Sequence, residues 1–433
     1  MAHYDNVICP FCGCVCDDIE ILTENNKIVN VKRGCAISTD KFLHCLEHRI
    51  PNPVIRVNGN VKEANLSDAL DKAAEILAKS KYPLLYGWSC TSSEAIKAGV
   101  ELAEELGGVM DNTSTVCHAP GLEAVQDVGE VGATLGQIKH RADLVVYWGC
   151  NPTQAHPRHF TRYSINVKGK WREGKKARKS ILVDVRKTPS SKIVDKFVQV
   201  QPGKDLELIT ALRMAARDEE FETDCIAGVP VSDIEEMADM MVNCELGIVF
   251  FGLGLTHSIG KSENIVAAIQ LVIDLNAKTK FLIMPMRGHF NVAGANKVLS
   301  WQMGYPFAVD FSHGYPRYNP GETSTVELLS REEFDAAIVV ASDPMATMPQ
   351  QIAANLAKIP LIVVDPAVSA TSLMADIHIP STFIGIESEG TVYRMDGVPL
   401  LMKKVLEPPP NCLPDTEILK ELLVRVRKLK RGS

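Results

Sequence analysis

Several features of membrane, secreted and nucleic-acid-binding proteins are missing from this sequence. A helix that spans a bilayer needs ~18 consecutive apolar residues, whereas apolar runs here, such as 360–364, have only the length of a strand. The start, Met1-Ala2-His3-Tyr4-Asp5, lacks the basic and apolar regions of a signal peptide and a twin-arginine motif. A surplus of positive charge is also lacking, because the net charge is −7. We therefore expect a cytoplasmic protein that binds neither membranes nor nucleic acid.

A disulfide framework is not expected either, although the chain has 12 cysteines. In a cytoplasmic chain of 433 residues, this number of cysteines indicates reduced thiols and metal ligation. The length allows two or three domains with sizeable cores. Hydrophobic residues make up 46% of the chain, which is typical of a soluble globular protein.

Four cysteines near the N-terminus have the spacing of an iron-sulfur site. The pattern C-x2-C-x3-C-x18-C is formed by Cys9, Cys12, Cys16 and Cys35. Three thiolates in one tight loop and a distant fourth can each bind one iron of a 4Fe-4S cluster. A structural zinc site usually has two separated short cysteine pairs, and the second pair is missing here. The spacing therefore predicts one 4Fe-4S cluster.

Two further cysteines lie close to this pattern. Cys14 is interpreted as a spectator in the turn. Cys45 is an alternative to Cys35, but the segment 42–46 that contains it resembles one face of a helix. Residues 1–56 are thus predicted to form a head that binds the cluster.

Helical and strand patterns alternate along the rest of the chain, which predicts an α/β fold. An Ala-rich amphipathic helix is expected from Leu66 to Ala78 and a last helix from Thr416 to Lys430, after three consecutive prolines. Most predicted strands are continuous apolar runs, typical of parallel sheets with helices on both faces. Their number indicates two doubly wound, Rossmann-like sheets. The predicted strands are 83–88, 144–148, 181–184, 248–251, 281–284, 337–340 and 361–364.

These elements suggest four segments. After the head, residues 57–137 together with 336–407 are predicted to form a first α/β domain. Residues 138–335 form a second α/β domain, and residues 408–433 form a C-terminal helix and tail.

Small and polar residues follow several of the predicted strands. Ligands of open parallel sheets bind at the carboxyl ends of strands, where glycine allows close approach and aspartate accepts hydrogen bonds. The pair Gly252 and Gly254 lacks the third glycine of a dinucleotide fingerprint. Together these loops predict a large ligand with several phosphates that contacts both sheets. The candidate residues are Gly149, Asn151, His156, Asp184, Arg186, Thr188, Gly252, Gly254, Ser342, Asp343 and Asp365.

At this point the sequence resembles the molybdopterin-dependent oxidoreductases, which include formate dehydrogenases. The matching motifs occur in the family's order over nearly the whole chain. Among them, the chain is most similar to the catalytic B subunits of formylmethanofuran dehydrogenases, tungsten or molybdenum enzymes that fix CO2 in methanogenic archaea. The motifs are Cys9-Pro10-Phe11-Cys12 to Cys16, Gly149-x-Asn151-Pro152 with His156-Pro157, Asp184 with Arg186 and Thr188, Pro202-Gly203-x-Asp205, Gly288-x-x-Asn291-Val292-x-Gly294-Ala295 and Glu389-Gly390-Thr391.

The resemblance implies one 4Fe-4S cluster, one tungsten or molybdenum, and two molybdopterin guanine dinucleotides. It makes the first α/β domain, 57–137 with 336–407, a domain that binds a pterin guanine dinucleotide. It also adds Gly203, Asp205, Gly288 and Asn291 to the cofactor-binding candidates. The choice between tungsten and molybdenum stays open, because both accept the same ligands.

The sequence departs from the family's pattern in two places. Formate dehydrogenases continue after Glu-Gly-Thr into a C-terminal pterin-binding barrel, which we expect to be absent from this chain. Relatives also place a lysine just after the fourth cluster cysteine, whereas here the first lysine after Cys35 is Lys41. The residue that bridges cluster and pterin is therefore undecided.

The resemblance also implies a set of partners. They are a D subunit that supplies the barrel, an amidohydrolase-like A subunit, a C subunit and a polyferredoxin-type electron donor. The stoichiometry of this complex and the identity of its physiological donor are left open.

Cys117 is the candidate metal ligand of the reaction centre. It lies in the polar segment 112–120, and a thiolate suits a metal already held by sulfur. The alternative is an inert buried thiol. Cys90 and Cys150 also follow strands, but neither has a histidine beside it.

Two further residues are candidates for handling the substrate. His118, with an ordinary pKa near neutrality, is expected to supply a proton or a hydrogen bond. Arg287 follows the strand 281–284, and its guanidinium matches the two oxygens of formate. A surface salt bridge is the alternative role for Arg287, and His289 is an alternative residue.

The expected reaction is the reversible reduction of CO2 to formate, which a separate subunit then condenses with methanofuran. The chain shows no HxH zinc pair for that second step. Two other functions stay open: a formate dehydrogenase-type subunit that makes free formate, and a non-catalytic iron-sulfur electron conduit without pterin.

Overall fold

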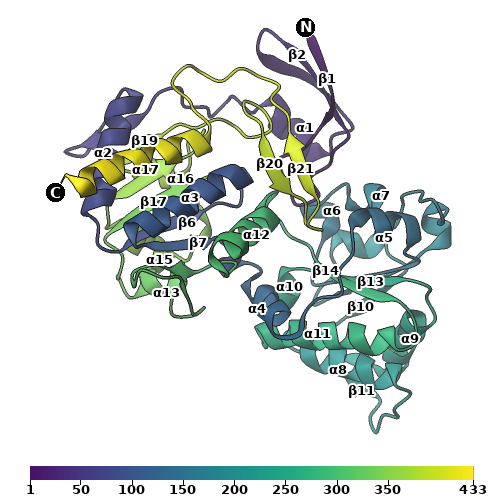
Figure 1. The fold of residues 1–433 in the computed structure, drawn as a ribbon. Helices are drawn as coiled ribbons and strands as arrows, with labels where there is room; N and C mark the ends of the chain where they lie inside the picture. The colour runs from purple at the N-terminus through teal and green to yellow at the C-terminus, as the bar shows by residue number, and fades with distance from the viewer. Residues whose placement is uncertain (433) are drawn as a thin grey trace. The chain divides into compact units, whose positions relative to one another are not determined.

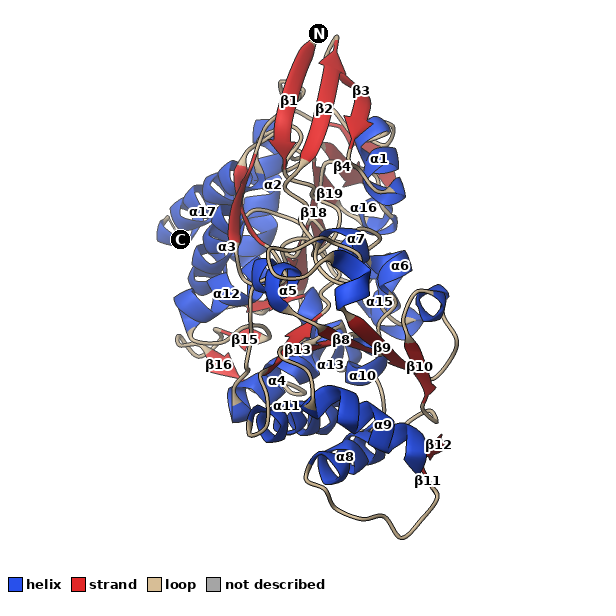
Figure 2. Ribbon diagram, turned by 90° about the vertical axis from the view of Figure 1, so that its right-hand side faces the viewer, coloured by secondary structure: helices blue, strands red, loops and turns tan. Residues whose placement is uncertain are grey.

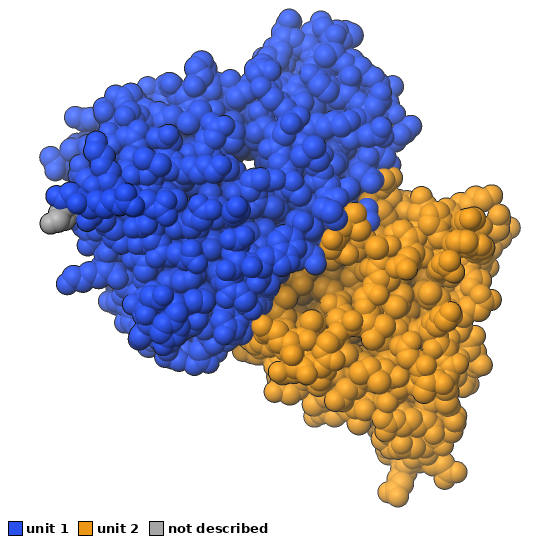
Figure 3. All heavy atoms as spheres, in the orientation of Figure 1, with its two compact units in different colours: residues 1–116, 289–394, 399–433 blue, residues 117–288, 395–398 orange. Residues whose placement is uncertain are grey.

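The computed structural model describes residues 1–432, and contacts divide them into two compact units. Unit 1 contains residues 1–116, 289–394 and 399 onwards, and unit 2 contains residues 117–288 and 395–398 (Figure 3). Among the described residues, none of the helices combines the length and apolar character that crossing a membrane requires.

Unit 1 begins with the predicted head, a small antiparallel sheet (Figure 2). Its strands are β1 (Ala2–Val7), β2 (Ile19–Glu24) and β3 (Lys27–Lys32), followed by helix α1 (Ala36–Leu43). Asn25 and Asn26 join β2 to β3 with positive φ angles of 48° and 57°, which tight hairpin turns require. Residues 8–18, between β1 and β2, form the loop that carries four cysteines.

The larger sheet of unit 1 has nine strands in the order β16-β15-β7-β6-β17-β18-β19-β4-β5. Its middle, from β7 to β19, is parallel, and the remaining strands pair antiparallel. The strands are β4 (Val54–Val57), β5 (Asn60–Glu63), β6 (Pro83–Gly87), β7 (Val109–Asn112), β15 (Val309–Asp310), β16 (Arg317–Tyr318), β17 (Ala336–Val340), β18 (Leu361–Val364) and β19 (Ile377–Ile379).

Both faces of this sheet are buried, which explains its continuous apolar strands. In β17, Ile338 and Val340 belong to one apolar core, whereas Ala337 and Val339 belong to another. The first core contains α2 (Leu66–Lys79), α3 (Ser93–Leu106), α12 (Val292–Met303) and α17 (Asp415–Arg431), and α17 packs on α2 and α3 (Figure 1). The other core contains α13 (Thr325–Ser330) and α15 (Gln350–Leu356). The remaining elements of unit 1 are η1 (Thr113–Val116), α14 (Pro344–Thr347), α16 (Ala370–Met374), β20 (Gly390–Tyr393) and β21 (Pro399–Met402).

Unit 2 is built on a five-stranded parallel sheet with the order β10-β9-β8-β13-β14. Its strands are β8 (Leu144–Trp148), β9 (Lys179–Asp184), β10 (Lys196–Gln199), β13 (Gly247–Phe251) and β14 (Phe281–Pro285). The helices are α4 (Ala119–Val128), α5 (Leu135–Arg141), α6 (Pro152–Ala155), α7 (His159–Arg162), η2 (Gly174–Ala177), η3 (Pro189–Lys192), α8 (Asp205–Ala216), α9 (Val231–Val242), α10 (Leu253–Thr256) and α11 (Lys261–Asn276), with a short hairpin of β11 (Cys225–Ile226) and β12 (Val229–Pro230).

The structure confirms an α/β fold with parallel sheets, and each predicted apolar run forms a strand. The units differ from the predicted segments in several places. The short stretch 395–398, predicted as part of the first α/β domain, belongs to unit 2. Residues 289–335 belong to unit 1, because β15 pairs with β7 and α12 packs on α3. Residues 117–137 belong to unit 2, where α4 packs on α11. The C-terminal helix is part of the core of unit 1 rather than a separate segment.

Candidate active site

The strand order places one candidate crevice in each unit. In unit 2 the chain proceeds from β8 to β9 and β10 on one side, and from β13 to β14 on the other. In unit 1 it proceeds from β6 to β7 on one side, and from β17 to β18 and β19 on the other. Ligands of open parallel sheets bind at the carboxyl ends of strands where the order reverses. These switch points lie between β8 and β13 and between β6 and β17.

Glycines allow the two loops at the switch point of unit 2 to touch. Gly149 has a φ of 58°, and a Cβ on it would lie 2.6 Å from the nitrogen of Leu255. A Cβ on Gly254 would lie 2.6 Å from the Cα of Gly149, and the Gly254 nitrogen donates to the Gly149 oxygen at 2.8 Å. Gly252 likewise faces the side chain of Cys150. These three predicted cofactor residues therefore have a packing role, and their contact with a ligand stays a prediction.

At the same edge, the loop after β13 holds Cys117. Thr256 Oγ1 and His257 Nε2 both donate to the Cys117 carbonyl, at 3.2 and 3.1 Å. Burial raises the pKa of the Cys117 thiol to about 11, and the nearby charge of Arg287 acts in the opposite direction. Arg287 partly offsets the effect of burial, but the net shift favours the protonated thiol at neutral pH.

His118 lies beside Cys117 with its ring buried. The ring packs edge-on against Phe251, with 6.1 Å between the centroids. Burial first, and then the charge of Arg287, lower the pKa of His118 to about 3. This value is far from the near-neutral pKa expected from the sequence, so the imidazole is neutral at physiological pH. Its Nδ1 atom is buried without a hydrogen-bond partner.

Arg287 reaches the same place from the end of β14. His156, after β8, is buried, and its Nε2 lies 2.8 Å from the Arg287 carbonyl oxygen. Since a carbonyl only accepts, Nε2 carries the proton and donates it. The charges of Cys117 and Glu130 act on the Arg287 guanidinium and raise its pKa, against the larger lowering caused by burial. Unit 2 therefore brings Cys117, His118 and Arg287 together, and His156 positions Arg287.

The rival residues have other surroundings. Cys150 is half-buried and donates to the Phe250 carbonyl, and desolvation raises the pKa of its thiol strongly. Cys90 and His289 belong to unit 1. Burial raises the pKa of Cys90 to about 12, and the Nδ1 of His289 lies 3.4 Å from Thr113 Oγ1.

Predicted cofactor residues at the other strand ends of unit 2 divide into two groups. Asp205 is committed to the fold, because Trp148 Nε1 and Ser258 Oγ donate to its two carboxylate oxygens. Asn151 is linked by hydrogen bonds to Ser190 in the loop after β9. Three other residues could contact a ligand. Asp184 is half-buried, and burial raises the pKa of its carboxyl group. Arg186 is exposed, and Thr188 is buried with no hydrogen-bond partner for its Oγ1.

Two predicted glycines of unit 2 also have distinct surroundings. Gly203 has a φ of 77° with the Ile259 side chain beside it, and Gly288 has open space where a Cβ would be.

The switch point of unit 1 shows a close approach that the sequence motifs missed. Gly87 has a φ of 122°, and a Cβ on it would lie 2.1 Å from the Val340 oxygen. Its position at the end of an apolar strand was the available signal.

Of the residues predicted nearby, Asp343 accepts from Thr371 at the start of α16, and Ser342 is half-buried beside it. Asn291 bonds Thr91 and Tyr393, so its side chain also has a structural role. Burial raises the pKa of Asp365 to about 7, and the charges of Asp415 and Asp343 act in the same direction.

The head gathers the four predicted cluster cysteines. The nitrogen of Cys9 donates to the oxygen of Cys16 at 2.9 Å, and the nitrogen of Val15 donates to the oxygen of Cys12 at 3.0 Å. Burial raises the pKa of Cys9, and the charges of Cys16, Cys12 and Cys35 add to this effect.

The two other cysteines near the pattern differ from these four. Cys14 is fully buried and hydrogen-bonds Cys12. Cys45 lies in the turn beyond the end of α1, not on a helix face. Burial raises the pKa of Cys45 to about 11, and the acting neighbour is Glu387 rather than another cysteine.

Lys41 on α1 lies close to the cluster loop. Its Nζ lies 5.6 Å from the centre of the Phe11 ring, and its charge acts on Cys12, Cys90 and His289. The first lysine after Cys35 is therefore placed next to the thiols.

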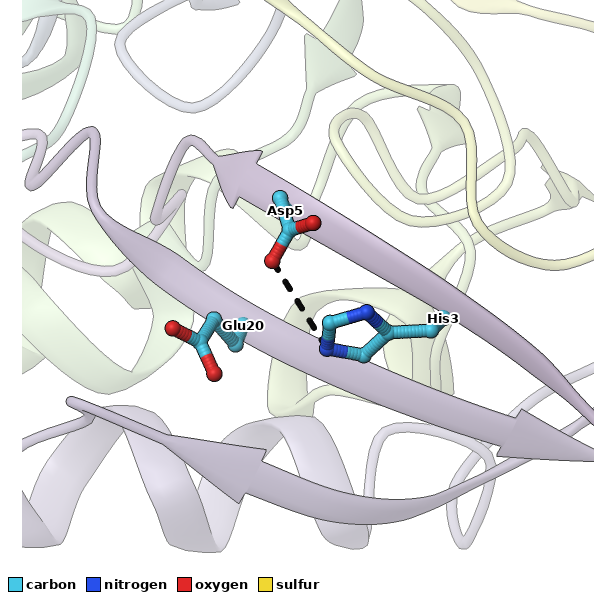
Figure 4. Close-up of side chains that lie close together, drawn as sticks. All are labelled: His3, Asp5 and Glu20. Carbon is cyan, nitrogen blue, oxygen red and sulfur yellow. Dashed lines mark ion pairs between the residues drawn. The ribbon is translucent and has the colours of Figure 1, made fainter.

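The head also carries a group of possible metal ligands on its outer face. Ligand atoms of His3, Asp5 and Glu20 lie within 4.8 Å of one another (Figure 4). Glu20, however, is already paired with Arg33 at 3.0 Å and Lys32 at 3.9 Å. Its charge is therefore largely neutralised by the protein itself.

Comparison with known proteins identifies the family. The molybdopterin oxidoreductase family model matches residues 49–425. The B subunit of tungsten-containing formylmethanofuran dehydrogenase 2 from Methanocaldococcus jannaschii is 49% identical over 428 residues, 98% of each chain. Its counterpart in Methanococcus maripaludis is 46% identical over 99% of this chain and 100% of its own. The chain belongs to the formylmethanofuran dehydrogenase B subunits of the molybdopterin oxidoreductase family. It is therefore an oxidoreductase.

More distant matches agree with the fold. Formate dehydrogenase H of Escherichia coli is 24% identical over 97% of this chain and 68% of its own length. Two solved structures share the fold at 15–20% identity: acetylene hydratase from Pelobacter acetylenicus, with a TM-score of 0.71, and a chain of the formyltransferase/hydrolase complex from Methylorubrum extorquens, with 0.69. The match to acetylene hydratase covers 99% of this chain and 70% of the hydratase. The match to the chain from Methylorubrum extorquens covers 88% of this chain and 100% of the other.

The cofactors of this family fit the residues present. Two switch points suit two dinucleotides, and the unpartnered Thr188 Oγ1 and Asp415 Oδ1 are buried polar atoms near them. Among the described residues, the group of possible ligand atoms that lie within 4.8 Å of one another does not include the head cysteines.

Proposed function

We propose that this chain reversibly reduces CO2 to formate at a tungsten or molybdenum centre. The observation that carries this proposal is the meeting of Cys117, His118 and Arg287 at the carboxyl edge of the sheet of unit 2. A soft ligand, a neutral hydrogen-bonding ring and a guanidinium suit a metal-bound site for a small carboxylate. The balanced reaction is CO2 plus two electrons and one proton to formate.

Cys117 would bind the metal through its thiolate. Two molybdopterin guanine dinucleotides would occupy the two crevices, with Asp184, Arg186 and Thr188 in unit 2 and Ser342 and Asp365 in unit 1 as the available polar groups. When bound, the metal centre supplies the exchange of two electrons with CO2 and formate. The tungsten-containing relatives support this cofactor class.

Arg287 would bind the two substrate oxygens. Its planar fork can donate two parallel hydrogen bonds to a carboxylate, and fewer waters compete for it because it is partly buried. Negative charge grows on these oxygens as CO2 becomes formate, so a fixed cation stabilises the product side and the transition state. Its charge also favours the thiolate of Cys117.

His118 would orient the substrate as a neutral ring. Burial, and then repulsion by the charge of Arg287, lower its pKa and so disfavour the imidazolium. One nitrogen donates and the other accepts in the neutral ring, and Nδ1 is available for such a bond. This role replaces the proton supply expected from an ordinary histidine.

Electrons would arrive through a 4Fe-4S cluster bound by Cys9, Cys12, Cys16 and Cys35. The coupling of Cys35 to Cys9 supports Cys35 over Cys45 as the fourth ligand. Lys41, beside Cys12, is our candidate for the bridge between cluster and pterin.

The complete enzyme would be a cytoplasmic complex. Its D, A and C subunits and a polyferredoxin-type donor are proposed from the family resemblance. The D subunit would supply the pterin-binding barrel, and the A subunit would condense formate with methanofuran.

Metal analysis combined with formate oxidation tests the proposal. Within the complex, purified without oxygen, this chain itself should hold one cluster of about four irons and one tungsten or molybdenum. The complex should oxidise formate with an artificial electron acceptor. Iron without tungsten, molybdenum or pterin would instead identify an electron conduit. Release of free formate as the end product, with no formylmethanofuran formed when methanofuran is supplied, would identify a formate dehydrogenase.

A further inference from the structure

One segment of unit 2 concentrates positive charge in a chain that is negative overall. Residues 168–179 contain seven basic residues and one acidic residue, whereas the chain has a net charge of −7. The last turn of α5 adds Lys139, His140 and Arg141. Such asymmetry indicates a surface for a partner of opposite charge.

An exposed tryptophan lies at the centre of this charge. Trp171 is 53% exposed, and the guanidinium carbon of Arg141 lies 4.2 Å from its ring centre. Lys170 Nζ lies 4.8 Å from the same ring. We call Trp171, Arg141 and Lys170 the tryptophan patch; Lys168, Lys175 and Lys176 are exposed in the same segment of the chain.

The backbone holds this patch firmly on the end of α5. The nitrogen of Trp171 donates to the His140 oxygen at 3.3 Å, and that of Lys170 donates to His140 Nδ1 at 2.9 Å. Arg178 adds three bonds to carbonyls, those of Lys139, Ala142 and Val167. The tryptophan is therefore presented in a fixed position rather than on a loose loop, which reduces the entropy lost when a partner binds.

The cations of the patch have free hydrogen-bonding capacity. Arg141 and Lys170 make no ion pair with any acidic residue in the part of the chain that the structure describes, although Lys168 pairs with Glu173. A guanidinium stacked on an indole still presents its donors at its edge, where a carboxylate can accept two of them. Exposed tryptophan and arginine are also the residues most enriched among binding hot spots.

The patch lies at the opposite end of the sheet from the candidate active site. Arg141 comes just before β8, and Lys179 begins the neighbouring parallel strand β9, so both mark the amino ends of strands. Arg287 follows the carboxyl end of β14 in the same parallel sheet. A partner can therefore bind the patch without covering the substrate.

We propose that the tryptophan patch binds an acidic surface of another polypeptide in the enzyme complex. Arg141 already covers the indole, so a nucleobase has less room to stack on it, and the net charge opposes nucleic-acid binding. Carboxylates, in contrast, match the unpaired donors of Arg141 and Lys170. A partner subunit is expected because the similar proteins are named as one subunit of a larger enzyme.

Photo-cross-linking in the purified native complex tests the proposal directly. The photoreactive residue p-benzoylphenylalanine replaces Trp171, and the peptides joined to it are sequenced. We expect an Asp- and Glu-rich peptide from a different polypeptide. Cross-links to nucleic acid, to a second copy of this chain or only within the chain would overturn the proposal, as would the absence of any cross-link.

Charge reversal gives a second, quantitative test. The double variant Arg141→Glu/Lys170→Glu should weaken association of the partner about tenfold. In native mass spectrometry, the variant complex should therefore lose the partner at a lower salt concentration than the wild-type complex does. The control Lys79→Glu/Lys81→Glu reverses two exposed lysines on unit 1 and should leave the salt dependence unchanged. Equal stability of both variants would overturn the proposal.

Activity separates this inference from the proposed reaction. The charge-reversed chain should still oxidise formate with an artificial acceptor at the unaltered rate, because the patch lies away from Arg287. If the wild-type complex oxidises no formate, the proposed function fails, yet subunit association still reports on the patch.

Discussion

Replacing Arg287 with lysine separates the geometry of this side chain from its charge. Lysine keeps the positive charge that acts on the Cys117 thiol, so binding of the metal should be preserved. It loses the planar fork, and with it one of two parallel donors to the substrate. Because that bond strengthens as charge develops on the oxygens, its loss should lower turnover more than substrate affinity.

The size of the effect follows from the burial of the site. Loss of one donor to a developing oxyanion costs about 2–4 kcal/mol, which corresponds to a ~30- to 1000-fold lower kcat. The assay is formate oxidation by the purified complex with an artificial electron acceptor, together with the spectrum of the metal centre. Arg287→Met should show the same loss and should also weaken metal binding, because it removes the charge beside Cys117.

Arg213→Lys is a matched control in the same unit. Arg213 on α8 bonds Asp274 and Gln270 on α11, away from the strand ends that carry Cys117 and Arg287. Its turnover should stay within about twofold of the wild type, as expected for a surface ion pair. Wild-type turnover by Arg287→Lys, or an equal loss in the control, would refute substrate binding by Arg287.

Four further outcomes are expected. Cys117→Ala should change the metal spectrum and abolish turnover, whereas His118→Gln should reduce turnover about 10- to 100-fold with the spectrum nearly intact; identical spectra for the two would contradict the assignment of the ligand. Cys35→Ser should remove the cluster signal in electron paramagnetic resonance, and retention of that signal would favour Cys45 as the ligand. His156→Ala should lower turnover by loosening Arg287, and His156→Gln, which keeps a donor to the carbonyl, should recover most of it; failure of glutamine to do better than alanine would argue against positioning. The pKa of Asp365 is about 7 in the folded state, above its unfolded value, so the folded protein retains this proton and its stability should fall as pH rises from about 4 to 7. Asp365→Asn should flatten this part of the pH dependence of unfolding, measured by circular dichroism.

The central strands could be predicted because burial on both faces leaves a clear pattern. Runs such as Leu361–Val364 are apolar at every position, since alternate side chains enter two different cores. Strands β15 and β16, at one end of the sheet, have only two residues each and carry no such pattern. The pairing of β15 with β7 depends on a long-range contact, which is why residues 289–335 were assigned to the wrong sheet.

The structure gives different surroundings to the predicted catalytic residues and to the predicted cofactor residues. Cys117, His118 and Arg287 are unusual for their sequence surroundings, and the structure brings them together. Asp205, Asn291 and Asp343 look like ligand residues at strand ends, but each satisfies hydrogen bonds of its own unit. The sequence does not distinguish an aspartate that accepts hydrogen bonds within the fold from one that binds a ligand, because only the hydrogen-bond partners in the structure differ.

The parallel sheet of unit 2 explains how distant residues can form one site. The backbone of each of two candidate residues is held by side chains from the loop of another strand: Cys117 by Thr256 and His257 after β13, and Arg287 by His156 after β8. Because β8, β13 and β14 are neighbours with all carboxyl ends on one edge, the order of the strands fixes which loops can make these bonds. The glycines at positions 149 and 254 bring the first two loops into direct contact. The position of the guanidinium relative to the thiol is therefore determined by the sheet and its loop contacts rather than by the two side chains alone.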